Sequence, residues 1–339
     1  MEATQEASSE EKPPPQPSLS LSVSASVSAS ASESASGSAS ASESEGERGE
    51  NAKKKVDVEA KLECLREEIA KRGKLLVAFS GGLDSGFLLK VACDVLSCEK
   101  VLAVTLDAEV FPRSEKVFAR ELAEEIGVRH KFVKFAWLSR KRLVENLPER
   151  CFFCKLAFTR LLKEVAAEEG FETIADGVTT SDLGRPGVKA SEGIWHPLAE
   201  ASLSKEDVRR LARMLKLPFW RKPSMSCLAT RIPYGMHISA ELLQRIEEAE
   251  EFLRESGFER VRVRVHSASH SSNSQPAVLL ARIEVGKEEL SKFNSEIMTE
   301  VCERLKRLGF HFVTLDLAGY QSGSMDTLHT AAVRRRDAI

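Results

Sequence analysis

The sequence lacks any long apolar segment and any large excess of charge. No run of about 18 apolar residues occurs in its 339 positions, so we expect no membrane-spanning helix. Lysine and arginine number 49 and aspartate and glutamate 51, and the resulting net charge of -2 requires neither nucleic acid nor an anionic membrane as a partner. Seven cysteines in a chain of this length do not suggest a secreted disulfide scaffold. These absences favour a cytoplasmic protein.

The first 54 residues lack the apolar side chains that a core requires. Three prolines at 13–15 precede a repeat of serine, alanine and glutamate, so we expect residues 1–54 to form a disordered Ser/Ala-rich tail. Organelle transit peptides are also serine-rich, but they are rich in arginine and poor in acids. Here Glu2 and Glu6 come early and the first arginine is Arg48. A solvated tail is therefore favoured, and organelle targeting stays the alternative.

The rest of the chain alternates short apolar runs with helical patterns. Apolar residues make up 42% of the sequence, enough to bury the cores of two domains. Strands are predicted at 75–79, 101–106, 131–135 and 173–175, and helices at 56–69, 85–96, 114–126, 154–169 and from 204. This order predicts an α/β fold, a doubly wound parallel sheet over residues 55–236. Its ligands should bind beyond the carboxyl ends of the strands, at the loops after Phe79, Leu106 and Ala175.

The pattern changes after residue 236. Helices are predicted at 239–255 and 287–308, strands at 260–265, 277–285 and 311–315, and a polar loop at 267–275. Charge and valine alternate in the first strand, which is typical of a half-exposed strand. We expect residues 237–321 to form a smaller α+β domain for substrate binding or oligomerisation, followed by a frayed tail at 322–339.

A glycine-rich loop, SGGLDS at residues 80–85, joins the first strand to the next helix. Gly81 and Gly82 allow a tight turn that brings backbone N–H groups close to an anion, and the helix dipole adds to the attraction. Ser80 and Ser85 can donate hydroxyl hydrogen bonds to phosphate. Asp84 would repel phosphate unless a divalent cation intervenes, which implies Mg²⁺. The loop fits neither the Walker A pattern nor the dinucleotide-binding pattern, and the alternative is a plain strand-to-helix turn.

Two cysteines, Cys151 and Cys154, lie at the start of a predicted helix. The helix dipole and the flanking Arg150 and Lys155 should favour thiolates there. A third cysteine, Cys227, lies in a predicted loop.

The loop around Cys227 has the same character, since Lys222 and Arg231 flank it and again favour a thiolate. Inert buried cysteines are one interpretation of the three. A structural zinc site is another, although no second C-x-x-C exists and His196 or His237 would have to complete it. The third is sulfur chemistry, or a cluster with an open iron position.

These motifs together resemble a known family. The loop at 80–85 resembles that of the ATP pyrophosphatases, the adenine nucleotide alpha-hydrolase superfamily, which implies cleavage of ATP between the α- and β-phosphates. The segments PERCFFCK (148–155), Asp176-Gly177, CLATR (227–231), VRVRVH (261–266) and ARIEV (281–285) follow in an order that resembles LarE-type sulfur transferases. That family makes the nickel-pincer nucleotide cofactor, and the resemblance covers about residues 58–316.

The resemblance implies a reaction and a set of cofactors. ATP with Mg²⁺ would adenylate a carboxylate of a pyridinium biscarboxylate mononucleotide, and a sulfur atom would then displace AMP. Asp176 and Gly177 would join the loop in binding ATP. Family members with one cysteine, at the position of Cys227, give up its own sulfur, whereas Cys151, Cys154 and Cys227 match members thought to hold a [4Fe-4S] cluster.

The resemblance also implies residues for an anionic substrate. Arg262 and Arg264 share one strand face, suit phosphate or carboxylate, and match phosphate-contacting positions, as does Arg231. Glu284 matches an acidic position near the site. A solvated strand face is the alternative for the arginines. We expect a small carboxylated nucleotide as substrate and a homo-oligomer, with no membrane or nucleic-acid partner.

Three other functions are alternatives on the sequence alone. A tRNA-thiolating enzyme shares the loop and often paired cysteines, but the sequence has no long basic stretch for RNA. An ammonia-using synthetase of the same superfamily would have no use for the three cysteines. A non-catalytic nucleotide-binding module would not need the carboxylate of Asp84.

Overall fold

The computed structural model describes residues 45–185, 187–268 and 278–325. The chain divides into two compact units, residues 1–48 and 49–339, and the elements below belong to the second unit apart from the first residues of α1. Most of the predicted tail lies outside the described residues. Helix α1 spans Glu45–Ala70, so residues 45–54 are helical where a tail was predicted. Most residues of this segment, EGERGENAKK, are glutamate, lysine, arginine or alanine, which are good helix formers and outweigh its two glycines. The predicted domain boundary at 236 stays a prediction.

A parallel sheet of four strands forms the first layer of the fold, as predicted. Its strands are β1 (Leu75–Ala78), β2 (Val101–Asp107), β3 (Arg129–Lys134) and β4 (Ile174–Asp176), in the order β3-β2-β1-β4. The strand order reverses between β1 and β4. In doubly wound sheets the ligand crevice opens at this point, beyond the carboxyl ends of the strands. The glycine-rich loop follows β1, and Asp176 ends β4 at the same edge.

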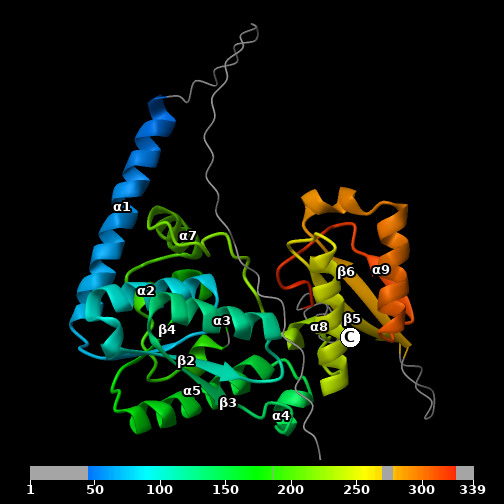
Figure 1. Cartoon of the computed structure of the whole chain (residues 1–339), viewed down its shortest axis with the longest axis horizontal. Coiled ribbons are helices and arrows are strands. Elements are labelled where there is room, and N and C mark those ends of the chain that lie inside the picture. The colour runs from blue at the N-terminus through cyan, green and yellow to red at the C-terminus, as the bar shows by residue number, and fades with distance from the viewer. Residues whose placement is uncertain (1–44, 186, 269–277, 326–339) are drawn as a thin grey trace, which may run out of the picture. The chain divides into compact units, whose positions relative to one another are not determined.

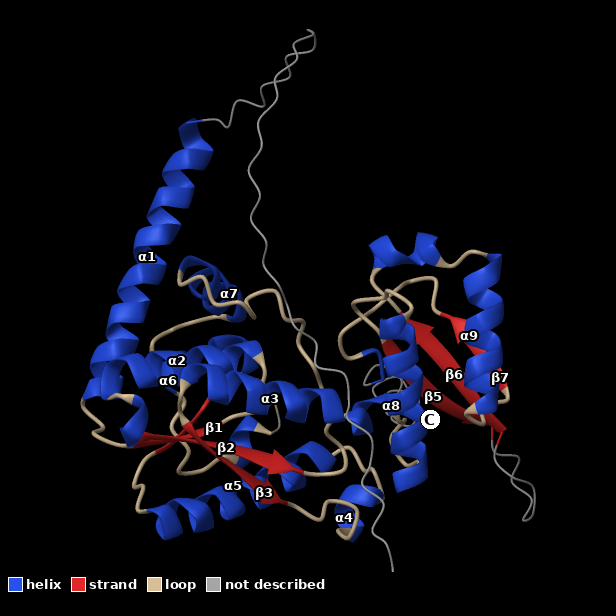
Figure 2. Ribbon diagram, in the orientation of Figure 1, coloured by secondary structure: helices blue, strands red, loops and turns tan. Residues whose placement is uncertain are grey.

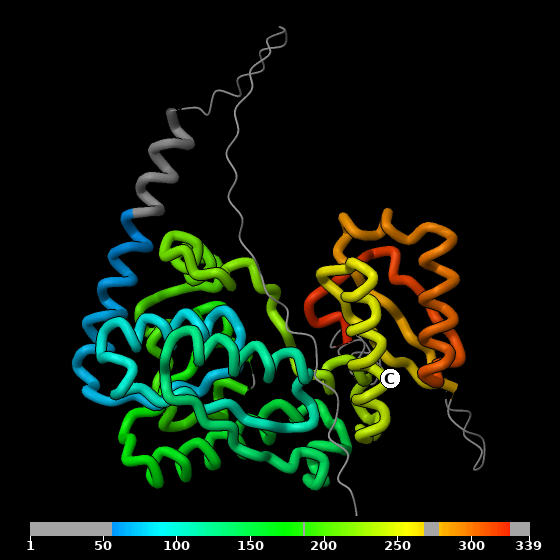
Figure 3. The backbone as a smooth tube through the Cα atoms, in the orientation of Figure 1, coloured from blue at the N-terminus to red at the C-terminus, as the bar shows by residue number. Residues whose placement is uncertain are grey.

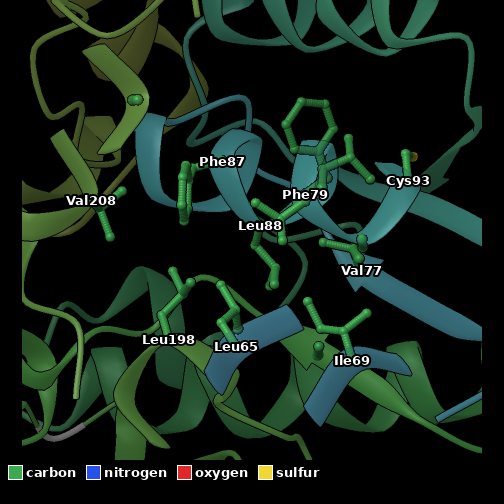
Figure 4. Packing of buried hydrophobic residues seen from close by; sticks show 14 of the residues in the cluster. Leu65, Ile69, Val77, Phe79, Phe87, Leu88, Cys93, Leu198 and Val208 are labelled. Atoms are coloured by element: carbon green, nitrogen blue, oxygen red, sulfur yellow. The ribbon is translucent and has the colours of Figure 1, made fainter. Parts of the chain in front are cut away.

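Helices cover both faces of this sheet (Figure 2). Helices α2 (Leu83–Leu96) and α3 (Arg113–Ile126) lie on one face, and α5 (Arg150–Glu169) lies on the other. Successive residues of a strand point to opposite faces. Val77 therefore packs with Ile69, Phe87 and Leu88 in one core cluster (Figure 4), whereas Leu76 packs with residues of α5 in another. Each fully buried side chain of this kind contributes about 1.5–3 kcal/mol to stability.

Apart from the start of α1, the helix predictions in this half are confirmed within a few residues. The apolar stripe of α1 is buried, with Val58 and Leu62 at most 5% exposed and Leu65 and Ile69 fully covered. Helix α7 (Lys205–Met214) begins with the predicted capping box of Ser204 and Asp207. Two short helices, α4 (Lys141–Val144) and α6 (Pro197–Glu200), and the 3-10 helices Cys98–Lys100, Thr180–Asp182, Val188–Ala190 and Leu228–Arg231 complete this part.

A second sheet lies later in the chain (Figure 1), and Figure 3 traces the same segment of the backbone from yellow to red. Strands β5 (Arg262–Ala268) and β6 (Val278–Glu284) pair antiparallel, and β7 (Phe312–Leu315) adds parallel to β6. Helices α8 (Ala240–Glu255) and α9 (Ser295–Arg307) accompany it. The long helix predicted at 287–308 is wrong in detail, because a 3-10 helix, Lys287–Lys292, ends before Asn294 caps α9. Most of the predicted polar loop lies outside the described residues.

One hydrophobic core joins the second sheet to the loops that follow β2 and β3. It contains Val263 and Ile246 together with Val110 and Trp137. Leu228, the residue after Cys227, is part of it and is 1% exposed. The backbone N–H of Leu228 donates to the carbonyl of Val110 at 2.8 Å. The cysteine loop is thus anchored in the core that joins the second sheet to the loops of the first. Among the described residues, no helix is long and apolar enough to cross a membrane.

Candidate active site

The glycine-rich loop is closed by its own hydroxyl groups. Ser85 Oγ lies 3.1 Å from Ser80 Oγ and accepts from the backbone N–H of Ser80 at 3.3 Å. Gly81 has φ +74°, a backbone conformation that favours glycine, and a side chain there would meet Ala119 at 3.1 Å. Helix α2 begins at Leu83, two residues earlier than predicted, so the loop lies directly at a helix N-terminus. Its N–H groups and the helix dipole suit an anion.

A polar relay supports the strand end that precedes this loop. Thr105 Oγ1 donates to the carbonyl of Phe79 at 2.7 Å. Since that hydroxyl has a single hydrogen, His130 Nε2 must donate to Thr105 Oγ1, 2.8 Å away. Burial lowers the pKa of His130 to about 4, so the imidazole is neutral at neutral pH. The relay joins three neighbouring strands next to Ser80.

Lys222 contacts the glycine-rich loop and not the cysteine beside which the sequence placed it. Its Nζ donates to the carbonyl of Gly81 at 3.0 Å and pairs with Glu115 at 3.0 Å. It also lies 3.4 Å from the centre of the Phe118 ring. Burial lowers the pKa of Lys222. The charges that act on Cys227 are instead those of Arg150 and Arg231.

Asp84 has the character of an incomplete cation site. Burial raises the pKa of Asp84 to about 6, and the neighbouring Asp182 adds to the shift while Lys205 opposes it. Within the described ranges no hydrogen bond or ion pair to this carboxylate is present. A partly buried carboxylate without a donor is stabilised by a cation, and carboxylate oxygen is the ligand that Mg²⁺ prefers. The residue therefore fits the Mg²⁺ that its position implies.

Asp176 and Gly177 reach the glycine-rich loop in different ways. A Cβ on Gly177 would lie 2.6 Å from the backbone nitrogen of Ser85, so this glycine packs directly on the first turn of α2. Asp176 is 4% exposed, and its carboxylate binds Lys155 Nζ and His196 Nδ1, each at 2.7 Å. Burial opposes ionisation, but His196 and Lys155 hold the pKa of Asp176 below its usual range. Both residues lie next to the loop, as the sequence suggested.

The structure brings the three candidate cysteines into one neighbourhood from two elements. Cys151 and Cys154 lie in the first turn of α5, and Cys227 caps the 3-10 helix that follows it. Arg150 joins the two elements, because its guanidinium donates to the carbonyl of Ala229 at 3.1 Å. Electrostatic interactions among all three cysteines contribute to the pKa values of Cys154 and Cys227.

The expectation that the surroundings favour thiolates does not hold for Cys154 and Cys227 in the free chain, because the pKa of each is raised. Burial raises the pKa of Cys154 to about 12 and also raises the pKa of Cys227, with Cys151 adding to the shift of each. Desolvation of these thiolates outweighs the nearby arginines. The indole N–H of Trp137 donates to Cys154 Sγ at 3.2 Å.

The three thiols do not form a preorganised metal site. In the part of the chain that is described, no group of three or more His, Cys, Asp or Glu side chains has metal-binding geometry. The donor chemistry suits an iron–sulfur cluster, which stabilises thiolates when it binds.

Arg231 is a buried organiser of the cysteine loop. It is fully covered, and its Nε and Nη2 donate to the two oxygens of Glu250 at 2.8 and 3.0 Å. Its Nη1 donates to the carbonyls of Ser226 and Cys227 at 2.9 and 3.0 Å. Burial opposes ionisation of Glu250, but Arg231 holds the pKa of that carboxyl below its usual range. The guanidinium thereby fixes the backbone on both sides of the Cys227 side chain.

Arg262 has one buried donor nitrogen that makes no hydrogen bond. It is 4% exposed, so the solvated strand face considered from sequence is wrong. Its Nη2 donates to the carbonyl of Ser224 at 2.8 Å, but its Nε is buried without a partner. Burial and the charge of Arg231 lower the pKa of Arg262 to about 10. A buried cationic donor without a partner is costly, and an anion placed there would stabilise it.

Arg264 and Glu284 form a matched pair on the same sheet. Arg264 is 4% exposed and donates from Nε to Glu284 at 3.0 Å and from Nη1 to the carbonyl of Thr230 at 3.1 Å. Glu284 is fully covered and also pairs with Arg282 at 3.1 Å. Arg264 thus contacts the CLATR segment from the strand side.

Sequence reasoning missed several residues of this region. Glu250 and Trp137 were not assigned to it, Lys222 was placed beside Cys227 and not on the phosphate loop, and His196 was considered only as a possible zinc ligand. Only Glu250 left a usable signal, because an acid lies in the apolar stripe of α8 between Ile246 and Leu253. The partners of the others lie far away in the chain.

The phosphate loop on this sheet defines the class, ATP-using enzymes of the PP-loop type, and comparison with known proteins narrows it. The NAD synthase family model matches residues 57–142. An uncharacterized protein of Synechocystis is 37% identical over 278 residues, which cover 80% of this chain and 99% of the relative. Pyridinium-3,5-bisthiocarboxylic acid mononucleotide synthase of Lactiplantibacillus plantarum is 36% identical over 263 residues, or 76% of this chain and 91% of that enzyme. A probable tRNA sulfurtransferase of Methanothermobacter thermautotrophicus is 26% identical over 160 residues, 42% of this chain.

The identity and coverage are high enough to place the chain. It belongs to the LarE-type family of ATP-dependent sulfur transferases. The resemblance drawn from the motifs is therefore confirmed, and the protein is an ATP-using sulfurtransferase enzyme.

Proposed function

We propose that this enzyme adenylates a carboxylate of a small, nucleotide-like substrate and then exchanges the bound AMP for sulfur. The observation that carries the proposal is the joint presence of a phosphate-binding loop, three thiols and a buried arginine with an unpartnered donor. The relative from Lactiplantibacillus plantarum, named as a pyridinium-3,5-bisthiocarboxylic acid mononucleotide synthase, supports a pyridinium biscarboxylate mononucleotide as substrate and nickel-pincer cofactor synthesis as the purpose. The tRNA sulfurtransferase covers too little of the chain to favour RNA.

The first half-reaction would take place at the glycine-rich loop. A substrate carboxylate oxygen attacks the α-phosphorus of ATP, the bond to the β-phosphate oxygen breaks, and pyrophosphate leaves. The N–H groups of residues 80–85 and the N-terminus of α2 would hold the pyrophosphate oxygens, and Asp84 would hold Mg²⁺, which offsets phosphate charge. Lys222 donates to the carbonyl of Gly81 and pairs with Glu115. Its ammonium group would turn from Glu115 to the leaving pyrophosphate.

The second half-reaction would use the cysteine region. A sulfur nucleophile attacks the carbonyl carbon of the acyl adenylate, the bond between that carbon and the AMP oxygen breaks, and AMP leaves. If the sulfur is that of Cys227, removal of its α-proton then breaks the Cβ–S bond and leaves dehydroalanine. If the family's [4Fe-4S] cluster is present, Cys151, Cys154 and Cys227 would hold it, and its open iron would carry a sulfide.

We assign the arginines different parts within this proposal. Arg262, with its free Nε, would meet the substrate phosphate or carboxylate, and Arg264 would lie beside it with Glu284 as its counter-charge. Arg231 would act through the loop of Cys227, because its guanidinium is engaged with protein groups. Asp176 and Gly177 would support the phosphate loop.

The proposal is tested by following products after anaerobic purification. With ATP, Mg²⁺ and pyridinium-3,5-biscarboxylic acid mononucleotide, the protein should release AMP and pyrophosphate and form a thiocarboxylate, and Asp84→Ala should abolish pyrophosphate release. Formation of ADP and orthophosphate would overturn the assignment to ATP pyrophosphatase chemistry.

The source of sulfur is decided by mass and metal analysis of the same samples. Bound iron that is lost in each of the Cys151→Ala, Cys154→Ala and Cys227→Ala variants supports the cluster. Iron-free protein in which Cys227 loses the elements of hydrogen sulfide during turnover supports sacrifice. Zinc in place of iron would make the site structural.

The organisation of the molecule stays a proposal as well. Residues 237–321 as a substrate or oligomerisation domain, a homo-oligomer, and a cytoplasmic location follow from the sequence analysis. Light scattering on the full chain tests the oligomer.

A further inference from the structure

The carboxylate of Asp176 is used up by contacts within the protein. Its Oδ2 accepts from Lys155 Nζ at 2.7 Å. Its Oδ1 accepts from His196 Nδ1 at 2.7 Å and from the backbone N–H of Val178 at 3.2 Å. The side chain is buried, so a cation or a nucleotide hydroxyl would have to displace one of these donors to reach it. The carboxylate of Asp176 is therefore better suited to connecting parts of the protein than to binding a cofactor. We call the hydrogen-bonded group Lys155–Asp176–His196 the tether.

The tether joins the two parts of the active site. Lys155 directly follows Cys154 on α5. On the other side, Gly177 follows Asp176 and packs so closely on the peptide between Asp84 and Ser85 that a Cβ would lie 2.6–2.9 Å from its atoms. The contact between Lys155 and Asp176 therefore connects the cysteine turn to the phosphate loop, because Lys155 follows Cys154 in the chain and Asp176 precedes Gly177.

His196 is the second side chain that holds the Asp176 carboxylate, and its own position is fixed by the backbone. The strand pairing of Ala175 with Trp195 continues on either side, because the Trp195 N–H donates to Ile174 at 2.8 Å and the Asp176 N–H donates to Trp195 at 3.1 Å. The second ring nitrogen of His196 lies 3.1 Å from Ser191 Oγ. Both ring nitrogens of His196 thus have a hydrogen-bond partner, and the imidazole in turn fixes the orientation of the Asp176 carboxylate.

We propose that Asp176 is a positioning residue, which through Lys155 holds the cysteine turn of α5 at a fixed distance from the adenylate formed at the phosphate loop. The inference rests on the proposed function. Sulfur transfer requires the nucleophile within about 3–3.5 Å of the acyl carbon, and a misplacement of about 1 Å can lower the rate about 100-fold. Adenylation, which takes place at the loop itself, does not depend on where the cysteines lie.

The test separates the two half-reactions in Lys155→Met. Isotope exchange between pyrophosphate and ATP, with pyridinium-3,5-biscarboxylic acid mononucleotide present, measures adenylation. Single-turnover formation of the thiocarboxylate measures sulfur transfer. We expect exchange within about 3-fold of wild type with an unchanged KM for ATP, and sulfur transfer lowered about 100-fold. Lys155→Arg, which keeps charge and reach, should restore most of the second rate.

Two further variants keep the result interpretable. Lys163→Met removes another lysine of α5 and should leave both rates unchanged. If Lys155→Met fails to fold because Asp176 is left buried and charged, the double variant Lys155→Met/Asp176→Asn removes that charge and should show the same selective loss. His196→Gln, whose amide can still donate to Asp176, should keep both rates near those of wild type.

The outcomes distinguish this inference from the proposed function. An equal loss of exchange and sulfur transfer in Lys155→Met would make Lys155 a ligand of ATP and overturn the positioning role. Unchanged sulfur transfer would also overturn it. Absence of exchange in the wild-type enzyme would instead reject the substrate in the proposed function.

Discussion

In the proposed function, the phosphate loop and the cysteine–arginine region both hold anions, and the structure equips them for this by opposite means. The loop at 80–85 uses backbone N–H groups, two hydroxyls and a helix N-terminus, and it leaves the carboxylate of Asp84 without a donor. The second region buries whole ions, and it matches Arg231 with Glu250 and Arg264 with Glu284. A local motif thus binds through backbone shape, whereas the distant one depends on ion pairs that only the tertiary fold brings together.

The largest expected effect tests how far the second region depends on those pairs. Glu250→Gln leaves Arg231 fully buried without its counter-charge, and breaking a buried pair costs about 3–5 kcal/mol of stability. Denaturant unfolding measures the loss. The double variant Arg231→Met/Glu250→Leu, which buries neither charge, should recover most of it. A double variant as unstable as Glu250→Gln would show that shape and hydrogen bonding, not charge, hold this loop.

This contrast explains what the sequence could predict. The phosphate loop was recognised in full because its six residues are contiguous, and the parallel sheet because each strand is a continuous apolar run. The second region was recognised only through its family motifs. Arg231 and Glu250 are 19 residues apart, and Arg264 and Glu284 are 20 apart, so neither pairing follows from helical or strand spacing. Burial of Arg262 and the raised pKa of Cys154 likewise depend on what the fold places over them.

The second prediction concerns pH and the relay beside the phosphate loop. The pKa of His130 is about 4 in the folded chain and about 6.5 when unfolded, so protonation favours the unfolded state. The stability that this histidine contributes is complete above pH 6.5 and is lost as pH falls from 6.5 toward 4. The full shift would correspond to about 3 kcal/mol, and because the ring is only partly buried, solvent screening reduces the expected loss to about 2 kcal/mol across that window.

Unfolding free energies of wild type and His130→Gln, measured from pH 7 to pH 4, isolate this effect. Glutamine can still donate to Thr105 but does not titrate, so its curve should lack the His130 contribution. Asp84, whose pKa is about 6, and the other acids titrate in both proteins and cancel in the difference. Parallel curves would mean that His130 gains no proton on unfolding in this range.

The third prediction tests the close packing at the phosphate loop. Gly177→Ala would place a Cβ 2.6 Å from the nitrogen of Ser85, which forces the first turn of α2 to shift. Overpacking of this kind costs about 1–3 kcal/mol, and the shift should raise the KM for ATP. Gly184→Ala is the matched control, because its Cβ would meet no atom within 4 Å. Equal effects of the two substitutions would remove the argument that Gly177 supports the loop.

The smallest expected effect separates Arg262 from Arg264, neighbours on one strand with different partners. Arg262→Met removes a buried cation whose Nε has no acceptor, but it also frees the carbonyls of Val261 and Ser224, so stability should fall only modestly. If that donor serves the substrate, KM for the mononucleotide should rise about 10-fold, which corresponds to about 1.4 kcal/mol, while KM for ATP stays the same. Product formation at varied concentrations of each substrate measures both constants.

Arg264→Met provides the contrast within the same strand. Its loss leaves Glu284 buried with Arg282 as the remaining cationic partner and frees the carbonyl of Thr230, so stability should fall more than in Arg262→Met. Arg262→Met should therefore have the larger effect on the KM for the mononucleotide, and Arg264→Met the larger effect on the free energy of unfolding. If Arg262→Met loses stability and leaves substrate KM unchanged, its unpartnered nitrogen is not a binding group, and the anion must meet another cation of this region.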